Sequence, residues 1–158
     1  IVANLPYNIG TALMLKWCQA KNIPRRMTLM FQKEVADRLT AQPHTQAYGR
    51  LSVWIQWKMD VKLLWILPPQ VFHPAPKVTS ALVQLTPRPE PLYKANASQL
   101  QLLLSTAFQQ RRKMLKRSLR NLPDYSETWF THTNIPPDAR PEALSIDDFC
   151  RLSYFIKL

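Results

Sequence analysis

The stretch IVANLPYNIGT, residues 1–11, shows most directly what kind of fold this sequence forms. Ile1 to Asn4 predict a short buried strand, and Thr11 is a suitable N-cap for a following helix. That helix carries the apolar residues Ala12, Leu13, Leu15 and Trp17. Met27 to Phe31 predict a second short buried strand, so the chain begins with the alternation of strand and helix that is typical of α/β proteins.

The segments that follow continue this pattern. Lys33 to Leu39 predict a helix, whereas YGRLSVWIQWKM (48–59) suits a strand by its composition and a helix by its length. VKLLWILPP (61–69) and VTSALVQLTP (78–87) predict two strands. The proline-rich loop PPQVFHPAPK (68–77) joins them, and most of its residues are confined to extended conformations. We expect the sheet to end with the second of these strands.

A helical region is predicted after the sheet. RPEPLYKANAS (88–98) has the composition of a linker, and a break in the helix after it is expected near Gln110. The apolar face of that helix consists of Leu100, Leu103, Leu104, Ala107 and Phe108. The predicted organisation is a partial α/β domain at residues 1–90 and a helical domain at residues 91–158.

The last helix has its own signal. Ser145 suits the N-cap position, and Asp148 at the third helical position predicts a capping box. The inner face of this helix is expected to consist of Phe149, Leu152, Phe155 and Ile156.

Composition restricts the possible partners and sites. The 158 residues, 46% of them hydrophobic, are enough for one core or a core with a small satellite domain. The net charge of +11 indicates a polyanionic partner, either nucleic acid or an anionic membrane surface. No apolar run reaches the roughly 18 residues that cross a bilayer, and no signal peptide opens the chain, so we expect a soluble, cytoplasmic monomer without a membrane partner. Cys18 and Cys150 are isolated, so neither a metal site nor a disulfide framework is predicted.

The order Asn4-Leu5-Pro6-Tyr7 suits one particular chemistry. An exocyclic amine of a nucleic-acid base is a poor nucleophile because its lone pair is delocalised, and an enzyme activates it by accepting hydrogen bonds from its N–H groups. The Asn4 side-chain oxygen and the Leu5 carbonyl, which Pro6 holds in a rigid turn, suit that role. Tyr7 offers a ring on which a flipped-out base can stack. These residues predict methylation of an adenine amine at the end of a strand, although four residues alone are equally consistent with an ordinary turn.

A second aromatic residue supports this hypothesis. Phe72 lies on the proline-rich loop directly before a strand, where a ring can cover the other face of a base. A single phenylalanine is as often part of a core as it is a stacking residue. The combination of Phe72 with the Asn4 to Tyr7 motif is harder to explain by packing alone.

A cationic cluster follows the expected helix break. Six cations stand within ten positions, namely Arg111, Arg112, Lys113, Lys116, Arg117 and Arg120. Such a run is often only a solvated face. Together with the net charge of +11 and the aromatic residues of the candidate site, it favours contact with RNA phosphates.

The sequence resembles the ribosomal RNA adenine N6-dimethyltransferase family, in the small-subunit branch that dimethylates two adjacent adenines near the 3′ end of small-subunit rRNA. The segments that carry the resemblance are NLPYNIGT, FQKEVADRL, YGRLSVWIQ, PPQVFHPAPKVTSALVQL and AFQQRRKMLKRSL, in family order. The resemblance implies that Asn4 is a catalytic residue that also lies beside the cofactor, and that Leu5 and Pro6 form the acceptor turn. It assigns Tyr7 and Phe72 to the aromatic residues of the site, and it implies that YGRLSVWIQ is helical.

The resemblance also implies the fold, the cofactor and the partner. The implied fold is α/β, the C-terminal half of a Rossmann-like class I methyltransferase sheet followed by a small all-α domain. The implied cofactor is S-adenosylmethionine, and the implied partner is small-subunit rRNA or a precursor of the 30S ribosomal subunit. Members of the family carry a glycine-containing loop and acidic residues before the asparagine motif, and this chain has neither there, so we expect the chain alone to be inactive.

Two alternative functions are consistent with the same fold. One is the large-subunit rRNA adenine methyltransferase of the macrolide-resistance type, and the other is a non-catalytic RNA-binding relative that acts in ribosome assembly. The segment AFQQRRKMLKRSL favours the small-subunit branch. The presence of Asn4, Pro6, Tyr7 and Phe72 favours an enzyme over a non-catalytic relative.

Overall fold

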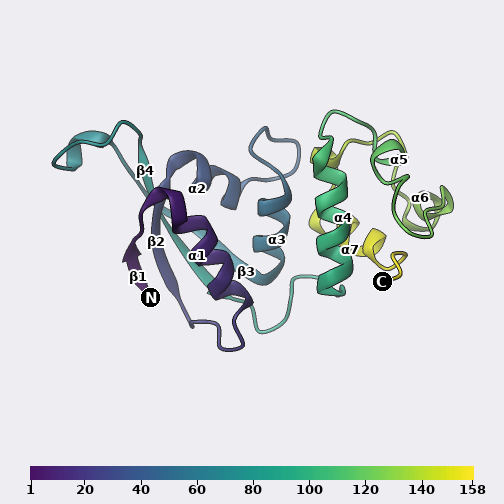
Figure 1. Ribbon diagram of the computed structural model, residues 1–158, viewed down its shortest axis with the longest axis horizontal. Coiled ribbons are helices and arrows are strands. Elements are labelled where there is room, and N and C mark those ends of the chain that lie inside the picture. The colour runs from purple at the N-terminus through teal and green to yellow at the C-terminus, as the bar shows by residue number, and fades with distance from the viewer.

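A four-stranded sheet forms the first half of the protein in the computed structural model, which describes residues 1–158 (Figure 1). Its strands are β1 (Val2–Asn4), β2 (Met27–Gln32), β3 (Met59–Leu67) and β4 (Ser80–Pro87), in the spatial order β1-β2-β4-β3. β1 is parallel to β2, and β4 is antiparallel to both β2 and β3. All four strands lie where the sequence predicts them, and the sheet ends at Pro87 as expected.

One face of this sheet carries the apolar core of the first half. On the face that the helices cover, the buried residues occupy alternate positions of the two central strands, namely Met27, Leu29 and Phe31 on β2 and Ala81, Val83 and Leu85 on β4. Met30 and Ser80 are buried on the opposite face. Three helices pack against the strands, α1 (Tyr7–Gln19), α2 (Lys33–Thr40) and α3 (Arg50–Lys58). Alternate burial is what a sheet covered by helices on one face requires, because successive side chains point to opposite faces.

Helix α1 begins earlier than the sequence predicts. Its first residue is Tyr7 with Pro6 at the N-cap, so the prediction of Thr11 as N-cap is wrong. The Pro6 carbonyl accepts hydrogen bonds from the backbone N–H groups of Ile9 and Gly10, at 3.1 and 3.0 Å. A proline is well suited to this place because it has no N–H to leave unpaired in the first turn.

The buried face of α1 consists of residues other than the apolar ones named from the sequence. Gly10, Met14 and Cys18, spaced four residues apart, are the buried residues of this helix. Of the predicted apolar residues, Ala12 is exposed, and Leu13, Leu15 and Trp17 are only half-buried.

The segment of ambiguous composition is the helix α3, as the family resemblance implies. Four of its apolar side chains, Val53, Trp54, Ile55 and Trp57, are buried. Because they surround the helix instead of forming one stripe, periodicity could not distinguish it from a strand. Packing therefore overrides the strand preference of these residues.

The strands β3 and β4 extend beyond the helices and carry a projecting loop. This loop contains the short 3-10 helix η1 (Pro69–Val71), and it lies at the far left of Figure 1. The outer part of β3 is exposed, and Trp65 there is 69% exposed. The loop that carries Phe72 thus stands away from the core, at the same edge as the end of β1.

The linker between sheet and helices is held in place. The backbone N–H of Leu92 donates to the Trp57 carbonyl at 2.8 Å, and the indole Nε1–H of Trp57 donates to the Tyr93 carbonyl at 2.7 Å. The backbone N–H of Arg88 donates to the Lys58 carbonyl at 3.0 Å. These bonds tie residues 88–93 to the end of α3, so the linker has a defined path.

The second half of the chain is helical. It contains α4 (Ala97–Gln109), α5 (Leu115–Ser118), α6 (Thr128–Thr133), the 3-10 helix η2 (Pro141–Ala143) and α7 (Ile146–Ser153). The predicted break at Gln110 is confirmed, and so is the apolar face of α4, with Phe108 half-buried at its end. No helix is long and apolar enough to cross a membrane.

The last helix begins with the capping box that the sequence predicts. The backbone N–H of Asp148 donates to Ser145 Oγ at 3.1 Å, and the Ser145 N–H donates to Asp148 Oδ2 at 2.9 Å. Phe149 and Leu152 are buried on the predicted face. Phe155 and Ile156 follow the helix end, where Ile156 is buried and Phe155 packs against the core.

The sheet and the helices share one continuous cluster of buried side chains, which runs from Met14 to Ile156. Aromatic contacts connect the two halves, since the Phe108 ring lies 6.4 Å from that of Tyr48 and 5.5 Å from that of Phe149. The division into domains at residue 90 stays a prediction, and the two regions it separates pack on each other directly.

Candidate active site

A pocket of about 410 Å³ lies beyond the end of β1. All five residues that the sequence assigns to catalysis line it, namely Asn4, Leu5, Pro6, Tyr7 and Phe72. Met30, His73, Pro74 and Pro76 complete the wall. The structure thus brings together two segments that are 65 residues or more apart in the sequence.

Two hydrogen-bond acceptors at this pocket have no partner within the protein. The Asn4 side chain, at the last position of β1, makes no hydrogen bond to another protein group. The Leu5 carbonyl accepts none either, because α1 begins at Tyr7 and its first turn uses the Pro6 carbonyl. The start of α1 therefore leaves an amide oxygen and a carbonyl oxygen free on adjacent residues.

Tyr7 is held by a residue that sequence reasoning missed. Its phenolic oxygen lies 2.5 Å from Oγ of Ser80, which is fully buried at the first position of β4. This hydrogen bond connects the NLPY motif to the strand that follows the Phe72 loop. A signal was available, because Ser80 is a small polar residue directly before the apolar run Ala81 to Val83.

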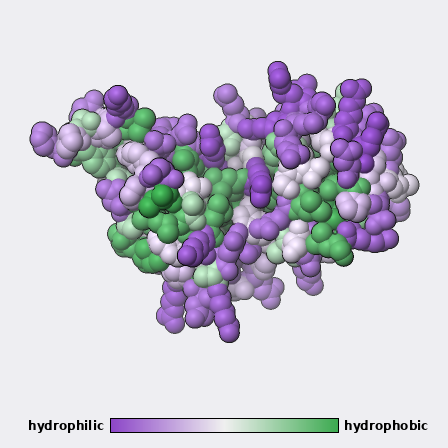
Figure 2. Space-filling view, in the orientation of Figure 1, coloured by the Kyte–Doolittle hydropathy of each residue, from purple (hydrophilic) through white to green (hydrophobic).

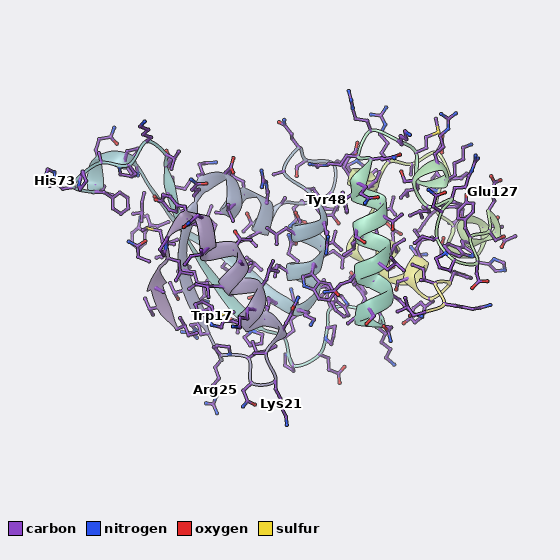
Figure 3. All side chains as sticks on the ribbon, viewed as in Figure 1. Trp17, Lys21, Arg25, Tyr48, His73 and Glu127 are labelled. Carbon is purple, nitrogen blue, oxygen red and sulfur yellow. The ribbon has the colours of Figure 1, made fainter.

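The floor and lid of the pocket are apolar. Met30, which pairs with Asn4 across the sheet, is 7% exposed. Phe72 is half-buried at the end of η1, and His73 follows it at the tip of the projecting loop (Figure 3). Rings and apolar side chains on two sides of a polar edge suit a flat ligand with N–H donors along one edge.

No carboxylate, lysine or arginine lines the pocket. The only titratable side chains in its wall are those of Tyr7 and His73. No group of three or more histidine, cysteine, aspartate or glutamate residues is placed to bind a metal ion. The arrangement favours chemistry that proceeds through neutral hydrogen bonds and stacking.

The two cysteines lie elsewhere and are buried, free thiols. Burial raises the pKa of Cys18 to about 11, with Lys58 opposing the shift. Burial, together with the negative charge of Asp147, raises the pKa of Cys150 to about 12. Both thiols are therefore protonated at neutral pH and are poor nucleophiles.

The predicted RNA-binding cations divide into two groups. Arg111 donates from Nη2 to the backbone carbonyls of Tyr48 and Gln46, the latter at 3.1 Å. The other cations, Arg112, Lys113, Lys116, Arg117 and Arg120, form no ion pair with an acidic side chain, and only Lys116 is half-buried. Arg111 thus fastens this segment to the loop before α3, and its neighbours are available for a partner.

The backbone around α5 directs these cations outward. The Leu115 N–H donates to the Ala139 carbonyl at 2.8 Å, and the Lys116 N–H donates to the Pro137 carbonyl at 3.1 Å. Leu115 and Leu119 are fully buried. With the apolar side chains inside, Arg117 and Arg120 face solvent.

The residues of the pocket suit only the reacting end of a methyl donor. Asn4 and the pocket wall are suited to the reacting end of S-adenosylmethionine, because Asn4 has a free amide there. The only two glycines, Gly10 in the first turn of α1 and Gly49 at the N-cap of α3, do not form a glycine-rich loop. The residues described here supply no evident site for the nucleoside part of the cofactor.

Comparison with known proteins agrees with this geometry. The model of the ribosomal RNA adenine dimethylase family matches residues 1–158. The proteins named ribosomal RNA small subunit methyltransferase A from Ruegeria sp. (strain TM1040) and Paramagnetospirillum magneticum are 46% and 48% identical to the chain. Each match covers 97% of this chain but only 56% and 54% of the relative, so the chain spans about half the length of these relatives.

Solved structures show the same fold. A dimethyladenosine transferase from Plasmodium falciparum superposes with a TM-score of 0.84 at 25% identity, over 96% of this chain and 64% of that one. The 23S rRNA methyltransferase ErmE superposes with a TM-score of 0.68 at 24% identity, over 98% of this chain and 64% of that one, which is a likeness of fold alone. The predicted fold class, part of a methyltransferase α/β sheet followed by helices, is confirmed.

Proposed function

The chain belongs to the ribosomal RNA adenine dimethylase family, and from this premise we propose that it forms part of a longer enzyme that dimethylates adenine N6 in RNA. The proposed substrate is a pair of adjacent adenines near the 3′ end of small-subunit rRNA, reached in the 30S subunit or its precursor. The names of the relatives support the small-subunit substrate over the large-subunit alternative. The proposed cofactor is S-adenosylmethionine, which when bound supplies a methyl group on a positively charged sulfur.

The observation that carries this proposal is the pair of free acceptors at the end of β1. An adenine amine placed in the pocket would donate one N–H to the Asn4 side-chain oxygen and the other to the Leu5 carbonyl. These hydrogen bonds favour a tetrahedral nitrogen, in which the lone pair is no longer delocalised into the ring. They strengthen as the nitrogen becomes positive, so they stabilise the transition state more than the ground state.

The aromatic residues would hold the base. Tyr7 and Phe72 lie on the two segments that wall the pocket, so a flipped-out adenine can stack between them. Ser80 fixes the Tyr7 ring through the 2.5 Å hydrogen bond. Met30 closes the floor, which helps to exclude water from the amine.

The pocket contains no strong base, and the proposed reaction needs none. An amine that has gained a methyl group becomes acidic, and its proton can pass to solvent or by way of the Asn4 amide oxygen. A second round on the same nitrogen then gives the dimethyl product. The absence of a carboxylate from the pocket wall agrees with this route.

The test is methyl transfer by the longer enzyme to small ribosomal subunits that lack the modification, with mass spectrometry of the RNA. Asn4→Ala removes one preorganised acceptor, and we expect kcat to fall by about 10²- to 10³-fold with RNA binding nearly unchanged. Asn8→Ala is the matched control, because Asn8 is exposed on α1 and does not line the pocket.

Two results would contradict the proposal. The first is dimethylation of adenine by the Asn4→Ala enzyme at the parent rate. The second is a product methylated on a cytosine or on a protein side chain. If Asn8→Ala lowers the rate as much as Asn4→Ala, the loss of rate comes from a disturbance near the start of α1 and not from the missing acceptor.

A further inference from the structure

A second group of cations lies at the opposite end of the sheet from the pocket. The loop between α1 and β2 carries Lys21, Arg25 and Arg26, and Lys16 stands in the last turn of α1. We call these four residues the α1–β2 basic surface. In Figure 3, Lys21 and Arg25 point away from the body of the molecule at its lower edge, whereas His73 beside the pocket lies at the far upper left.

The charges of this surface are not neutralised by residues 1–158. All four side chains are exposed, and none takes part in an ion pair. The first acidic residue in the sequence is Glu34, so no carboxylate lies within the first 33 residues. Figure 2 shows hydrophilic side chains projecting from the lower edge, where Figure 1 places this loop.

Unpaired cations in such a short segment favour a partner with closely spaced negative charges. Like charges repel one another over distances within a Debye length, about 8 Å at physiological salt, and a polyanion relieves this repulsion. Each phosphate that a lysine or arginine neutralises also releases counterions. The loop protrudes (Figure 1), so it suits the backbone of a nucleic acid better than an enclosed small anion.

The same loop lacks what an anionic membrane would require. Segments that bind at a membrane surface insert apolar side chains between the headgroups. Two apolar side chains stand among the loop's cations, and neither is exposed: Ile23 is packed against the protein core and Pro24 is half-buried. Phosphates of RNA are therefore the better match.

The position of the surface indicates which RNA it contacts. β2 runs from Met27, next to Arg26, towards Met30 at the pocket floor, so the surface and the pocket lie at opposite ends of this strand. We propose that the α1–β2 basic surface grips the phosphates of a second RNA segment, separate from the one that presents the target adenine. This inference rests on the RNA-modifying function proposed above.

A folded RNA is then held at several points. Helix α5, whose segment carries the other cationic cluster, lies at the upper right of Figure 1, on the other side of the molecule from the α1–β2 loop. Contacts on opposite sides suit a large structured substrate, which proteins recognise mainly through shape and phosphate positions. A short RNA that carries only the target sequence would not reach this surface.

The experiment compares two triple variants of the longer enzyme that have the same net charge. Lys21→Gln/Arg25→Gln/Arg26→Gln removes the loop cations, and Lys62→Gln/Lys94→Gln/Lys157→Gln removes three exposed cations outside both cationic segments. Dissociation constants are measured over a range of salt concentrations for two RNAs, the unmodified small ribosomal subunit and a short hairpin that carries the target adenines. Thermal unfolding checks that both variants fold.

We expect the loop variant to bind the subunit at least tenfold more weakly at low salt, with the salt dependence lowered by about two to three units of slope. Its binding to the hairpin should equal that of the control variant. The inference is overturned if the loop variant matches the control on the subunit, or if hairpin binding weakens equally. It is also overturned if the loop variant loses binding to vesicles of anionic phospholipid while subunit binding is retained.

These outcomes are separate from the fate of the proposed function. An enzyme that binds the subunit through the loop but does not methylate adenine would contradict the function and support the surface. An enzyme that methylates adenine but binds the subunit equally well without the loop cations would support the function and contradict the surface.

Discussion

Tyr7 shows how a single residue connects two distant parts of the candidate site. Its ring lines the pocket, and its hydroxyl is bonded to the buried Ser80 at 2.5 Å. Ser80 begins the strand that follows the Phe72 loop, so the hydrogen bond also relates the two aromatic rings to each other. We infer that Ser80 is a positioning residue, since it would act on a substrate only through Tyr7.

This role predicts coupling between the two side chains. Tyr7→Phe keeps the ring but removes the hydrogen bond, and Ser80→Ala removes it from the other side. Each should lower kcat/KM about 3- to 10-fold, because a net hydrogen bond contributes about 0.5 to 1.5 kcal/mol. Ser80→Thr, which keeps the hydroxyl, should restore most of the activity.

The double variant separates positioning from general destabilisation. If the pair acts as a unit, Tyr7→Phe/Ser80→Ala loses little more activity than either single variant. Losses that simply add would contradict the coupling. The thermal midpoint of each variant shows how much of the effect comes from stability.

Among the elements, the segment around α5 combines a structural cation with several free ones. Arg111 is bonded to backbone carbonyls of the loop before α3, whereas Arg112 and Arg117 are exposed and unpaired. The sequence could not distinguish them, since all belong to the same run of cations. Their contacts predict different consequences for substitution.

We expect Arg112→Gln/Arg117→Gln to weaken RNA binding and to lower its salt dependence by about one to two units of slope, with stability unchanged. Arg111→Gln should instead lower the free energy of unfolding by about 1 to 3 kcal/mol, the range for a lost hydrogen bond from a charged donor. Lys94→Gln, which changes an exposed cation outside this segment, is the control. Titrations against salt and chemical denaturation measure the two effects, and an unchanged slope would assign these cations to a solvated face.

For the whole molecule, the question is how much of a methyltransferase this chain represents. It spans about half the length of its relatives, since the matches cover 56% and 54% of those proteins. The chain itself has one continuous buried cluster that includes both the sheet and the helices. It contains the free acceptors of the pocket but no glycine-rich loop for the cofactor nucleoside.

We therefore expect the 158-residue chain alone to bind S-adenosylmethionine weakly or not at all. The longer enzyme should bind it, because residues outside this chain would hold the nucleoside. Calorimetric titration of both proteins with the cofactor decides the matter. Comparable affinity in the chain alone would show that the cofactor site has been misplaced.

Local features of this protein follow from its sequence. The strands, the capping box of α7, the apolar face of α4 and the break at Gln110 depend on alternation, periodicity and capping within a few residues. These signals are local, so they can be read from the sequence without knowledge of the fold. The NLPY motif belongs to the same class, because its order alone suggested two acceptors beside an aromatic ring.

Other features depend on contacts between distant segments. The start of α1 at Tyr7, which leaves the Leu5 carbonyl free, reflects how Gly10, Met14 and Cys18 pack on the sheet. The roles of Ser80 and Arg111 come from partners 73 and 63 residues away. The α1–β2 basic surface and the cations around α5 lie apart because the helices and strands between them fold into one core. No pattern within a few residues encodes such pairings, because the free energy that selects them is gained only when the complete core is buried.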